Sequence, residues 1–275
     1  MYTVLDLDRD LAVLEKQGAK VFTVGYSELG RPIKGVFKGA PDGPQLLMQG
    51  AIHAREWVTA QLCVLLAENY TGECGLWCIP MVNPDGAMLA QYGLDSVGNK
   101  EKRDFLYRIN GYSDDFSLWK ANARAVDLNV NFNALWGTGK SNMTYPAPAN
   151  YIGPYPLSES ESRTLAEFTE KVRPRYTVSY HARGRVIYYG FDGLNPDPDV
   201  PYIASAETGY PAYTSEGSSG GYKDWFVLTT YRAGITVEVG SEGTPYQELQ
   251  KELPSMLAQN KGLLGALSRA AKGET

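Results

Sequence analysis

The segment GAIHAREWVTAQL, residues 50–62, joins an apolar run to a helix-like pattern and carries one of only two histidines in the chain. His53 and Glu56 are three residues apart, and Arg55 lies between them. The preceding run, PQLLMQG, indicates a buried β-strand, and the apolar residues that follow recur at helical spacing. His53 and Glu56 are therefore expected at the junction of a strand and a helix.

The same alternation of strand-like and helix-like segments continues along the chain. Further strands are predicted at residues 20–27, 31–39, 75–82, 175–191 (two strands and a turn) and 233–240, and helices at 6–18, 56–70, 157–172 and 245–272. Ser158 is the expected N-cap of the third helix, with Glu161 three residues later, and Pro254 is expected to kink the last. This order predicts an α/β fold with helices on both faces of a sheet, and residues 1–275 as one domain.

One long region does not fit the alternation. Residues 83–86, NPDG, have the composition of a turn, and residues 87–156 are rich in Gly, Asn, Tyr and Pro. A loop region of this length in a compact domain is usually functional or misread.

Composition argues against several classes of function. The chain has 275 residues, 43% of them hydrophobic, and a net charge of −5, which is unfavourable for nucleic acid or an anionic membrane as the main partner. It lacks a run of about 18 apolar residues, so no membrane span is expected, and its first residues lack the pattern of a signal peptide. Three cysteines, Cys63, Cys74 and Cys78, cannot all pair, so we expect free thiols and a cytoplasmic location. The oligomeric state is left open.

The second histidine, His181, follows the strand-like segment YTVSY. Ligands in open α/β sheets bind at the carboxyl ends of strands, where both histidines are expected. A short pair of ligands and one distant ligand is a common layout for catalytic zinc, which keeps one position open for water. His53, Glu56 and His181 are thus candidate zinc ligands. The alternative is two core histidines bonded to the backbone and a Glu in the first turn of a helix.

A carboxylate, Glu238, ends the strand-like segment GITVE. A carboxylate after apolar strand residues is costly unless it is paired or used. In a zinc hydrolase it could take a proton from the attacking water and pass it to the leaving amine. The alternative is an exposed Glu at a strand end.

Six segments together resemble the carboxypeptidase A-like zinc metallopeptidases. They are GAIHAREW, NPDG, WKANARAVDLN, GPYPLSESE, SYHARG and DWFVLTTYRAGITVEVG, in the family's order, over roughly residues 20–265. The resemblance implies a single-domain mixed β-sheet flanked by helices on both faces, Zn²⁺ as cofactor, and hydrolysis of peptide bonds by a metal-activated water. It also implies zinc ligands at His53, Glu56 and His181 and a general base at Glu238.

Further positions follow from the same resemblance. Arg55 matches a subsite arginine, and Asn129 matches an asparagine that helps bind the terminal carboxylate of the substrate. Lys120 falls where digestive members have an arginine that polarises the scissile carbonyl, and a lysine keeps the charge without the bidentate fork. The usual Asn-Arg pair reads Asn129-Val130, so the arginine that anchors a free C-terminal carboxylate is missing. The position of the mobile tyrosine holds Glu216.

The segments DLNVNFNALWG and GYKDWF look more like a bacterial subgroup, the γ-D-glutamyl-meso-diaminopimelate peptidases, which cleave peptidoglycan stem peptides. Lys223 stands where digestive members shape their specificity pocket, and a lysine there indicates an acidic group on the substrate. Arg183 and Arg185 could supply further carboxylate contacts. The alternative is that all three are solvated surface cations.

The expected function is therefore cleavage of γ-D-Glu-meso-diaminopimelate bonds, with a peptide or muropeptide as the binding partner. A general metallocarboxypeptidase that releases C-terminal residues is one alternative, and Val130 counts against it. A catalytically silent peptide-binding protein on a peptidase scaffold is another, and the His/Glu/His set with Glu238 counts against it. Hydrolysis of N-acyl amino acids by a related zinc fold is a third, and the segments NPDG and WKANA favour a peptide instead. Endo and exo cleavage are both left open.

Overall fold

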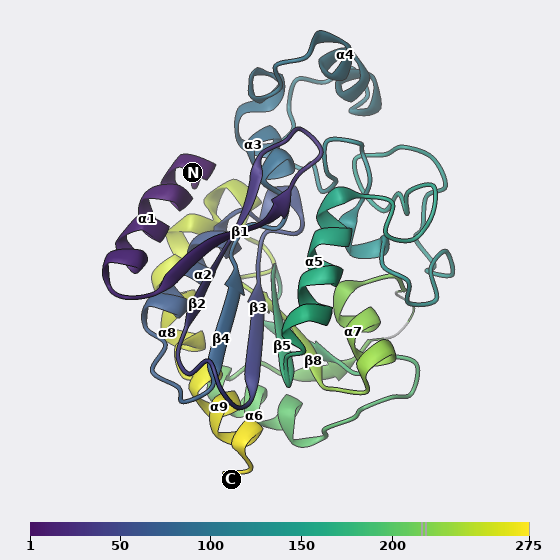
Figure 1. The fold of residues 1–275 in the computed structure, drawn as a ribbon. Helices are drawn as coiled ribbons and strands as arrows, with labels where there is room; N and C mark the ends of the chain where they lie inside the picture. The colour runs from purple at the N-terminus through teal and green to yellow at the C-terminus, as the bar shows by residue number, and fades with distance from the viewer. Residues whose placement is uncertain (216, 218, 275) are drawn as a thin grey trace.

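An eight-stranded mixed β-sheet forms the centre of the molecule, with the strand order β1-β2-β4-β3-β5-β8-β6-β7 (Figure 1). This computed structural model describes residues 1–215, 217 and 219–274. The strands are β1 (Lys20–Tyr26), β2 (Pro32–Lys38), β3 (Gln45–Gln49), β4 (Gly75–Ile79), β5 (Tyr176–Ala182), β6 (Val186–Tyr189), β7 (Ala212–Thr214) and β8 (Gly234–Val239). The central strands β4, β3, β5 and β8 are parallel, whereas β2 and β6 run antiparallel to the central strands they pair with.

Helices cover both faces of the sheet, as predicted (Figure 1). One face carries α1 (Val4–Lys16), α2 (Val58–Glu68), α6 (Asp199–Thr208), α8 (Leu253–Asn260) and α9 (Leu263–Lys272), and the other carries α5 (Ser160–Val172) and α7 (Tyr222–Thr230). Successive side chains of a strand point to opposite faces. Met48 of β3 therefore packs in the first cluster and Leu47 in the second, and both are fully buried.

Two helices lie inside the region predicted as loop. They are α3 (Pro84–Tyr92) and α4 (Lys100–Ile109), and they pack in a third apolar cluster around Trp119. The turn prediction for NPDG is wrong, because Asn83 is the N-cap of α3: its side chain accepts a hydrogen bond from the Gly86 N–H, and a proline occupies the first turn. Of the residues of α4 only Leu106 is buried, and its first five residues, 100–104, are all charged, so the segment offers few core-facing side chains.

Two other helix predictions differ from the structure. The segment 245–272 is not one kinked helix but a 3-10 turn, η4 (Tyr246–Glu252), followed by α8 and α9, with Pro254 in the first turn of α8. Ser158 is not the N-cap of α5, because that position belongs to Glu159 and the Ser158 hydroxyl donates to the Glu159 carboxylate. Helices α6 and α7 and strand β7 had no counterpart in the prediction.

The sheet brings three strand ends to one edge. Strands β3, β5 and β8 are adjacent and parallel, so their carboxyl ends meet there. His181 of β5 is the register partner of Glu238 of β8, and His53 lies just beyond the end of β3. The sheet order thus collects, at one edge, residues that are far apart in the sequence.

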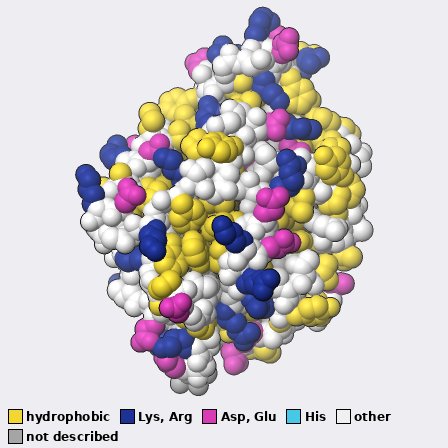
Figure 2. Space-filling view, viewed as in Figure 1, with side chains coloured by type: hydrophobic (Ala, Val, Ile, Leu, Met, Phe, Trp, Pro, Cys, Tyr) yellow, Lys and Arg dark blue, Asp and Glu magenta, His cyan; other side chains and the backbone are white. Residues whose placement is uncertain are grey.

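Two expectations about the rest of the chain can be compared with the structure. Cys63, Cys74 and Cys78 are all buried and unpaired, as expected. Within the described residues, no helix has the length and apolar character needed to cross a membrane. Figure 2 shows positive and negative side chains interspersed over the face drawn there, without a broad patch of one sign.

Candidate metal centre and catalytic site

The chain leaves β3 through Gly50, where it passes too close to its neighbours for any side chain. A Cβ at this position would lie 2.9 Å from the Cys63 Sγ atom and 2.9 Å from the carbonyl oxygen of Thr59. The next residue, Ala51, donates its N–H to the Thr59 hydroxyl at 2.7 Å. The close packing against α2 fixes the path of the chain toward His53, which precedes the 3-10 turn η1 (Ala54–Glu56).

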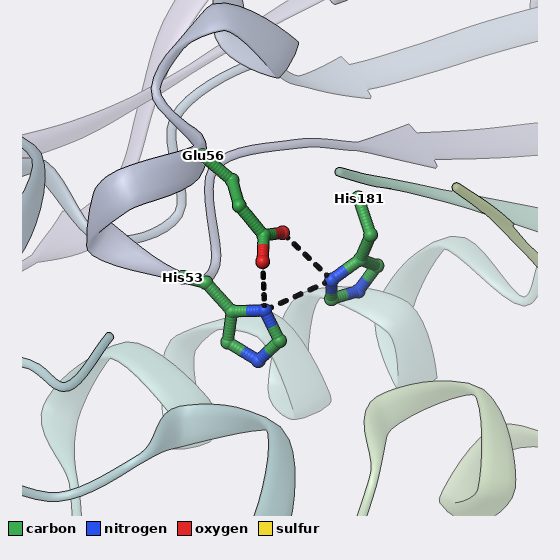
Figure 3. A group of neighbouring side chains, drawn as sticks. All are labelled: His53, Glu56 and His181. Carbon is green, nitrogen blue, oxygen red and sulfur yellow. Dashed lines mark hydrogen bonds and ion pairs between the residues drawn. The ribbon is translucent and has the colours of Figure 1, made fainter. Parts of the chain in front are cut away.

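His53, Glu56 and His181 come together as predicted (Figure 3). The Glu56 Oε1 atom lies 2.9 Å from the His53 Nδ1 atom, and Oε2 lies 3.1 Å from the His181 Nδ1 atom. The two Nδ1 atoms are 3.1 Å apart. All three side chains are buried, and the N–H of Ala182 also donates to the Glu56 carboxylate. The first turn after β3 therefore supplies two of the converging groups and β5 supplies the third.

This group fits a zinc ion. A tetrahedral ion with bonds of about 2.0–2.1 Å holds neighbouring ligand atoms roughly 3.3 Å apart, close to the separations here. Two imidazole nitrogens and a carboxylate are the donor types of catalytic zinc sites. Burial raises the pKa of Glu56, but the two imidazoles outweigh burial and lower it, so the carboxylate is ionised as a ligand must be.

A carboxylate that the sequence analysis did not assign, Asp127, lies behind His53. Its Oδ1 atom is 3.4 Å from the His53 Nε2 atom, and its Oδ2 atom is 2.8 Å from the Lys120 Nζ atom. It also accepts the backbone N–H groups of Asn129 and Asn150 at 3.1 and 3.0 Å. Burial raises the pKa of Asp127, but Lys120 and His53 outweigh burial and lower it. The sequence feature that could have indicated a role for Asp127 was its position as a single acidic residue within the otherwise apolar stretch AVDL.

Lys120 is held beside the metal ligands by both its backbone and its side chain. Its carbonyl accepts the N–H of Ala54 at 3.1 Å, and its ammonium is paired with Asp127. Burial lowers the pKa of Lys120, but Asp127 outweighs burial and raises it, so the side chain is cationic. The Asn83 amide donates to the carbonyls of Ile52, which precedes His53, and of Ala121, which follows Lys120. The segment NPDG therefore holds the chain near His53 close to the chain near Lys120.

Glu238 faces the same edge of the sheet and lines a cavity of about 290 Å³. Burial raises the pKa of Glu238 to about 7, against the opposing effect of His181. The cavity walls include Asn129, Ser215, Lys223, Asp224 and Thr236 together with Glu238. Tyr188 and Gly221 complete the walls, so a ligand in this cavity would meet mainly polar side chains and one aromatic ring.

Lys223 is not a solvated surface cation, because its side chain is only 5% exposed. Its Nζ atom donates to the Gly190 carbonyl at 2.5 Å and to the Ser215 hydroxyl at 2.7 Å, and it pairs with Asp224 at 2.5 Å. Burial lowers the pKa of Lys223, and Asp224 opposes that shift. Lys223 and Glu238 line the same cavity.

The three arginines divide into two groups. Arg55 and Arg183 both lie over the ring of Tyr246, with guanidinium carbons 4.5 and 5.1 Å from its centre, and each donates to a backbone carbonyl. Arg185 pairs with Glu252 at 3.2 Å, and its side chain is 43% exposed. The structure therefore does not bring Arg185 to the group around the metal ligands.

Asn129, which precedes the position of the missing carboxylate anchor, lies at the cavity wall. The Asn129 amide oxygen accepts the backbone N–H of Tyr222 at 3.0 Å, and its N–H₂ group donates to no acceptor in the part of the chain that the structure describes. Its neighbour is Val130, which offers no charge. Glu216, at the position of the family's mobile tyrosine, lies outside the described residues.

The sequence model described as zinc carboxypeptidase matches residues 6–261, a span that contains every residue of the site. The chain therefore belongs to the zinc carboxypeptidase family.

The chain is also similar to individual known proteins. It is 32% identical over 243 residues to γ-D-glutamyl-L-diamino acid endopeptidase 1 of Lysinibacillus sphaericus, covering 81% of this chain and 61% of the relative's length. The fold is similar to that of bovine thrombin-activatable fibrinolysis inhibitor (TM-score 0.77, 17% identity, 98% and 97% of the two chains). It is also similar to that of murein-tripeptide amidase from Escherichia coli O157 (TM-score 0.57, 21% identity, 86% and 90%).

Proposed function

We propose that this protein is a zinc-dependent peptidase that hydrolyses γ-D-glutamyl–diamino acid bonds, such as γ-D-Glu-meso-diaminopimelate, in peptidoglycan stem peptides. The observation that carries the proposal is the buried His53/Glu56/His181 group beside Glu238, next to a polar cavity that contains an ion pair. The Lysinibacillus relative, whose name specifies this bond, supports the choice of substrate.

The chemistry follows from the residues present. Zinc held by His53, Glu56 and His181 would act as a Lewis acid, which makes water a better nucleophile and polarises a carbonyl. Glu238 takes a proton from the attacking water and delivers it to the leaving amine. Lys120 has three N–H groups and two partners among the described residues, so the remaining N–H can stabilise negative charge that develops on the carbonyl oxygen.

The proposed substrate class follows from the positions of the cationic side chains around the site. Val130 cannot hold a free C-terminal α-carboxylate by a charge-assisted hydrogen bond, a contact worth about 1.5–3 kcal/mol. Arg55 and Arg183 are proposed to contact the glutamyl α-carboxylate, together with the amide N–H₂ of Asn129. Arg185 has no place in this proposal, because its guanidinium is paired with Glu252.

General release of C-terminal residues is less well supported, because the anchoring cation is absent at position 130. A catalytically silent binding protein would have no use for Glu238 at the edge of the metal-ligand group.

We also propose a cytoplasmic location, on the ground that three free cysteines suit a reducing compartment. Cell fractionation tests this proposal, and it fails if the protein is found outside the cytoplasm.

Defined substrates test the proposed function. The zinc-loaded protein is incubated with L-Ala-γ-D-Glu-meso-diaminopimelate or with a hippuryl-type C-terminal substrate, and the products are identified by mass spectrometry. We expect release of diaminopimelate, with a higher kcat/KM than for the hippuryl substrate. Preference for the hippuryl substrate would favour a general carboxypeptidase, and hydrolysis of neither would favour a silent binding protein.

A further inference from the structure

Asn122 is a fully buried residue between Lys120 and Asp127, and its side chain has no part in the chemistry described above. Its amide oxygen accepts the backbone N–H groups of Arg124 and Val126 at 2.9 and 3.1 Å, and its own backbone N–H donates to the Val126 carbonyl at 2.8 Å. These three hydrogen bonds close the segment into a tight turn. One end of the turn leads to Lys120 and the other to Asp127.

One residue of this turn has an unfavourable backbone conformation. Ala125 has a φ of 59°, in the left-handed region, which is uncommon for a residue other than glycine and persists only where neighbouring contacts hold it. Its N–H donates to the Asn122 carbonyl at 3.1 Å, and the same carbonyl accepts the Trp119 indole N–H at 3.3 Å. The conformation of the turn therefore depends on contacts of both the backbone and the side chain of Asn122.

The amide N–H₂ group of Asn122 attaches this turn to the start of α5. It donates to the Glu159 carboxylate at 2.8 Å and to the Glu161 carboxylate at 3.1 Å, and both glutamates are fully buried. Glu159 is the N-cap residue of α5. Two segments that the sequence analysis singled out, WKANARAVDLN and GPYPLSESE, thus meet at one side chain.

The turn sets the spacing between two groups of the site. The Lys120 ammonium and the Asp127 carboxylate, on either side of the turn, are 2.8 Å apart, and the same carboxylate lies 3.4 Å from the His53 Nε2 atom. A displaced turn would move the ammonium relative to the substrate carbonyl and the carboxylate relative to His53. Misplacement of a catalytic group by about 1 Å can cost about 10²-fold in rate.

We propose that Asn122 is a positioning residue: its contacts with Glu159 and Glu161 fix the places of the Lys120 ammonium and the Asp127 carboxylate at the metal centre. This inference rests on the proposed function, in which Lys120 stabilises charge on the scissile carbonyl. Among the described residues Asn122 has no hydrogen bond to a metal ligand, so it acts through Lys120 and Asp127.

A double-mutant cycle separates this role from a general effect on the fold. Asn122→Ala should lower kcat on the γ-D-glutamyl substrate about 10- to 100-fold at equal zinc content, with a smaller change in KM, because the ammonium is displaced. In a Lys120→Met background, which lacks the ammonium, the same substitution should cost less than about 3-fold. Losses that multiply in the double variant would show that Asn122 does not act through Lys120, and would overturn the inference.

A second measurement does not depend on the substrate. In competition with a chelator, Asn122→Ala should bind zinc about 3- to 10-fold more weakly, a smaller loss than for removal of the Asp127 carboxylate, which is here displaced and not lost. Asn260→Ala is the matched control, because Asn260 is also fully buried and its amide donates to the Met256 carbonyl at 2.9 Å. This control should keep the wild-type zinc affinity and kcat. Unchanged zinc affinity in folded Asn122→Ala would overturn the inference.

A milder variant covers the case in which Asn122→Ala does not fold, since that substitution leaves two buried carboxylates without a donor. Asn122→Ser keeps a hydroxyl oxygen for the N–H groups of the turn, but its side chain is too short to reach the glutamates. We expect its kcat and its zinc affinity each to fall by at least about 3-fold. Wild-type values in folded Asn122→Ser would overturn the inference. Cleavage of neither defined substrate by the wild type would overturn the proposed function, and the zinc affinities would then decide this inference alone.

Discussion

The Oδ1 atom of Asp127 lies 3.4 Å from the Nε2 atom of His53, on the side of the ring opposite the Nδ1 atom that meets Glu56. The other oxygen of the same carboxylate pairs with Lys120. A carboxylate behind a histidine ligand fixes the tautomer and orientation of the ring and increases its basicity. Asp127 therefore links the metal ligands to the cation that is proposed to stabilise the substrate carbonyl.

Asp127→Asn should weaken zinc binding about 10- to 100-fold, the usual cost of removing such a partner. His53 and Lys120 face different oxygens of Asp127, and the amide replaces one of these oxygens with an N–H₂ donor, so one of the two partners loses its acceptor. Competition with a chelator of known affinity measures the effect. Lys120→Met is the control, because it should lower activity but hold zinc nearly as the wild type does. Unchanged zinc affinity in Asp127→Asn would contradict this role.

His53→Ala and His181→Ala should each abolish stoichiometric zinc binding, because two remaining protein ligands rarely hold a catalytic zinc ion. The purified wild-type protein should contain one zinc ion per chain. Elemental analysis gives the content, and circular dichroism shows whether each variant is folded. Full occupancy in either folded variant would remove that histidine from the ligand set.

Glu238→Gln should keep zinc and fold and lose most activity, since loss of a general acid–base group typically costs about 10²–10⁴-fold in rate. The amide has nearly the same shape as the carboxylate but cannot take the proton. The comparison is kcat on the γ-D-glutamyl substrate at equal zinc content. Activity within a few-fold of the wild type would mean that another residue transfers the proton.

A pH dependence of stability should come from Glu161, which is fully buried at the start of α5. Burial raises its pKa to about 7, with a further contribution from Asp85, while hydrogen bonds from the Glu28 N–H and the Asn122 amide oppose the shift. The folded protein holds this proton more tightly than the unfolded chain, so stability falls as pH rises from about 4.5 to 7.

The substitution Glu161→Gln should remove this loss of stability at higher pH. Relative to the wild type, the free energy of unfolding of the variant should rise by up to about 3 kcal/mol between pH 4.5 and pH 8. Urea unfolding at several pH values measures the difference. Parallel curves for the two proteins would show that Glu161 does not titrate in this range.

Thiol titration of denatured, unreduced protein should count three free cysteines, because Cys63, Cys74 and Cys78 are each buried and unpaired. Reduced protein treated in the same way is the control. A stable Cys74–Cys78 disulfide in fresh protein would contradict the structure.

The sequence by itself determined the parts of this protein that depend on local pattern. Apolar periodicity located most strands and helices, and strand-like runs before His53 and His181 and around Glu238 placed all three at strand ends. The predictions failed where a segment buries few of its residues, as in α4, which buries only Leu106 and begins with five charged residues.

Only the tertiary structure decided which distant residues meet. The parallel register of β5 and β8 sets Glu238 beside His181, and the return of the chain after α4 sets Asp127 behind His53. Burial then distinguishes cations that look alike in the sequence: Lys223 is enclosed with Asp224, whereas Arg185 is half exposed beside Glu252. The physical reason is that strand order, burial and ion pairing depend on contacts between segments that are far apart in the sequence. The spacing of residues within one segment carries no information about those contacts.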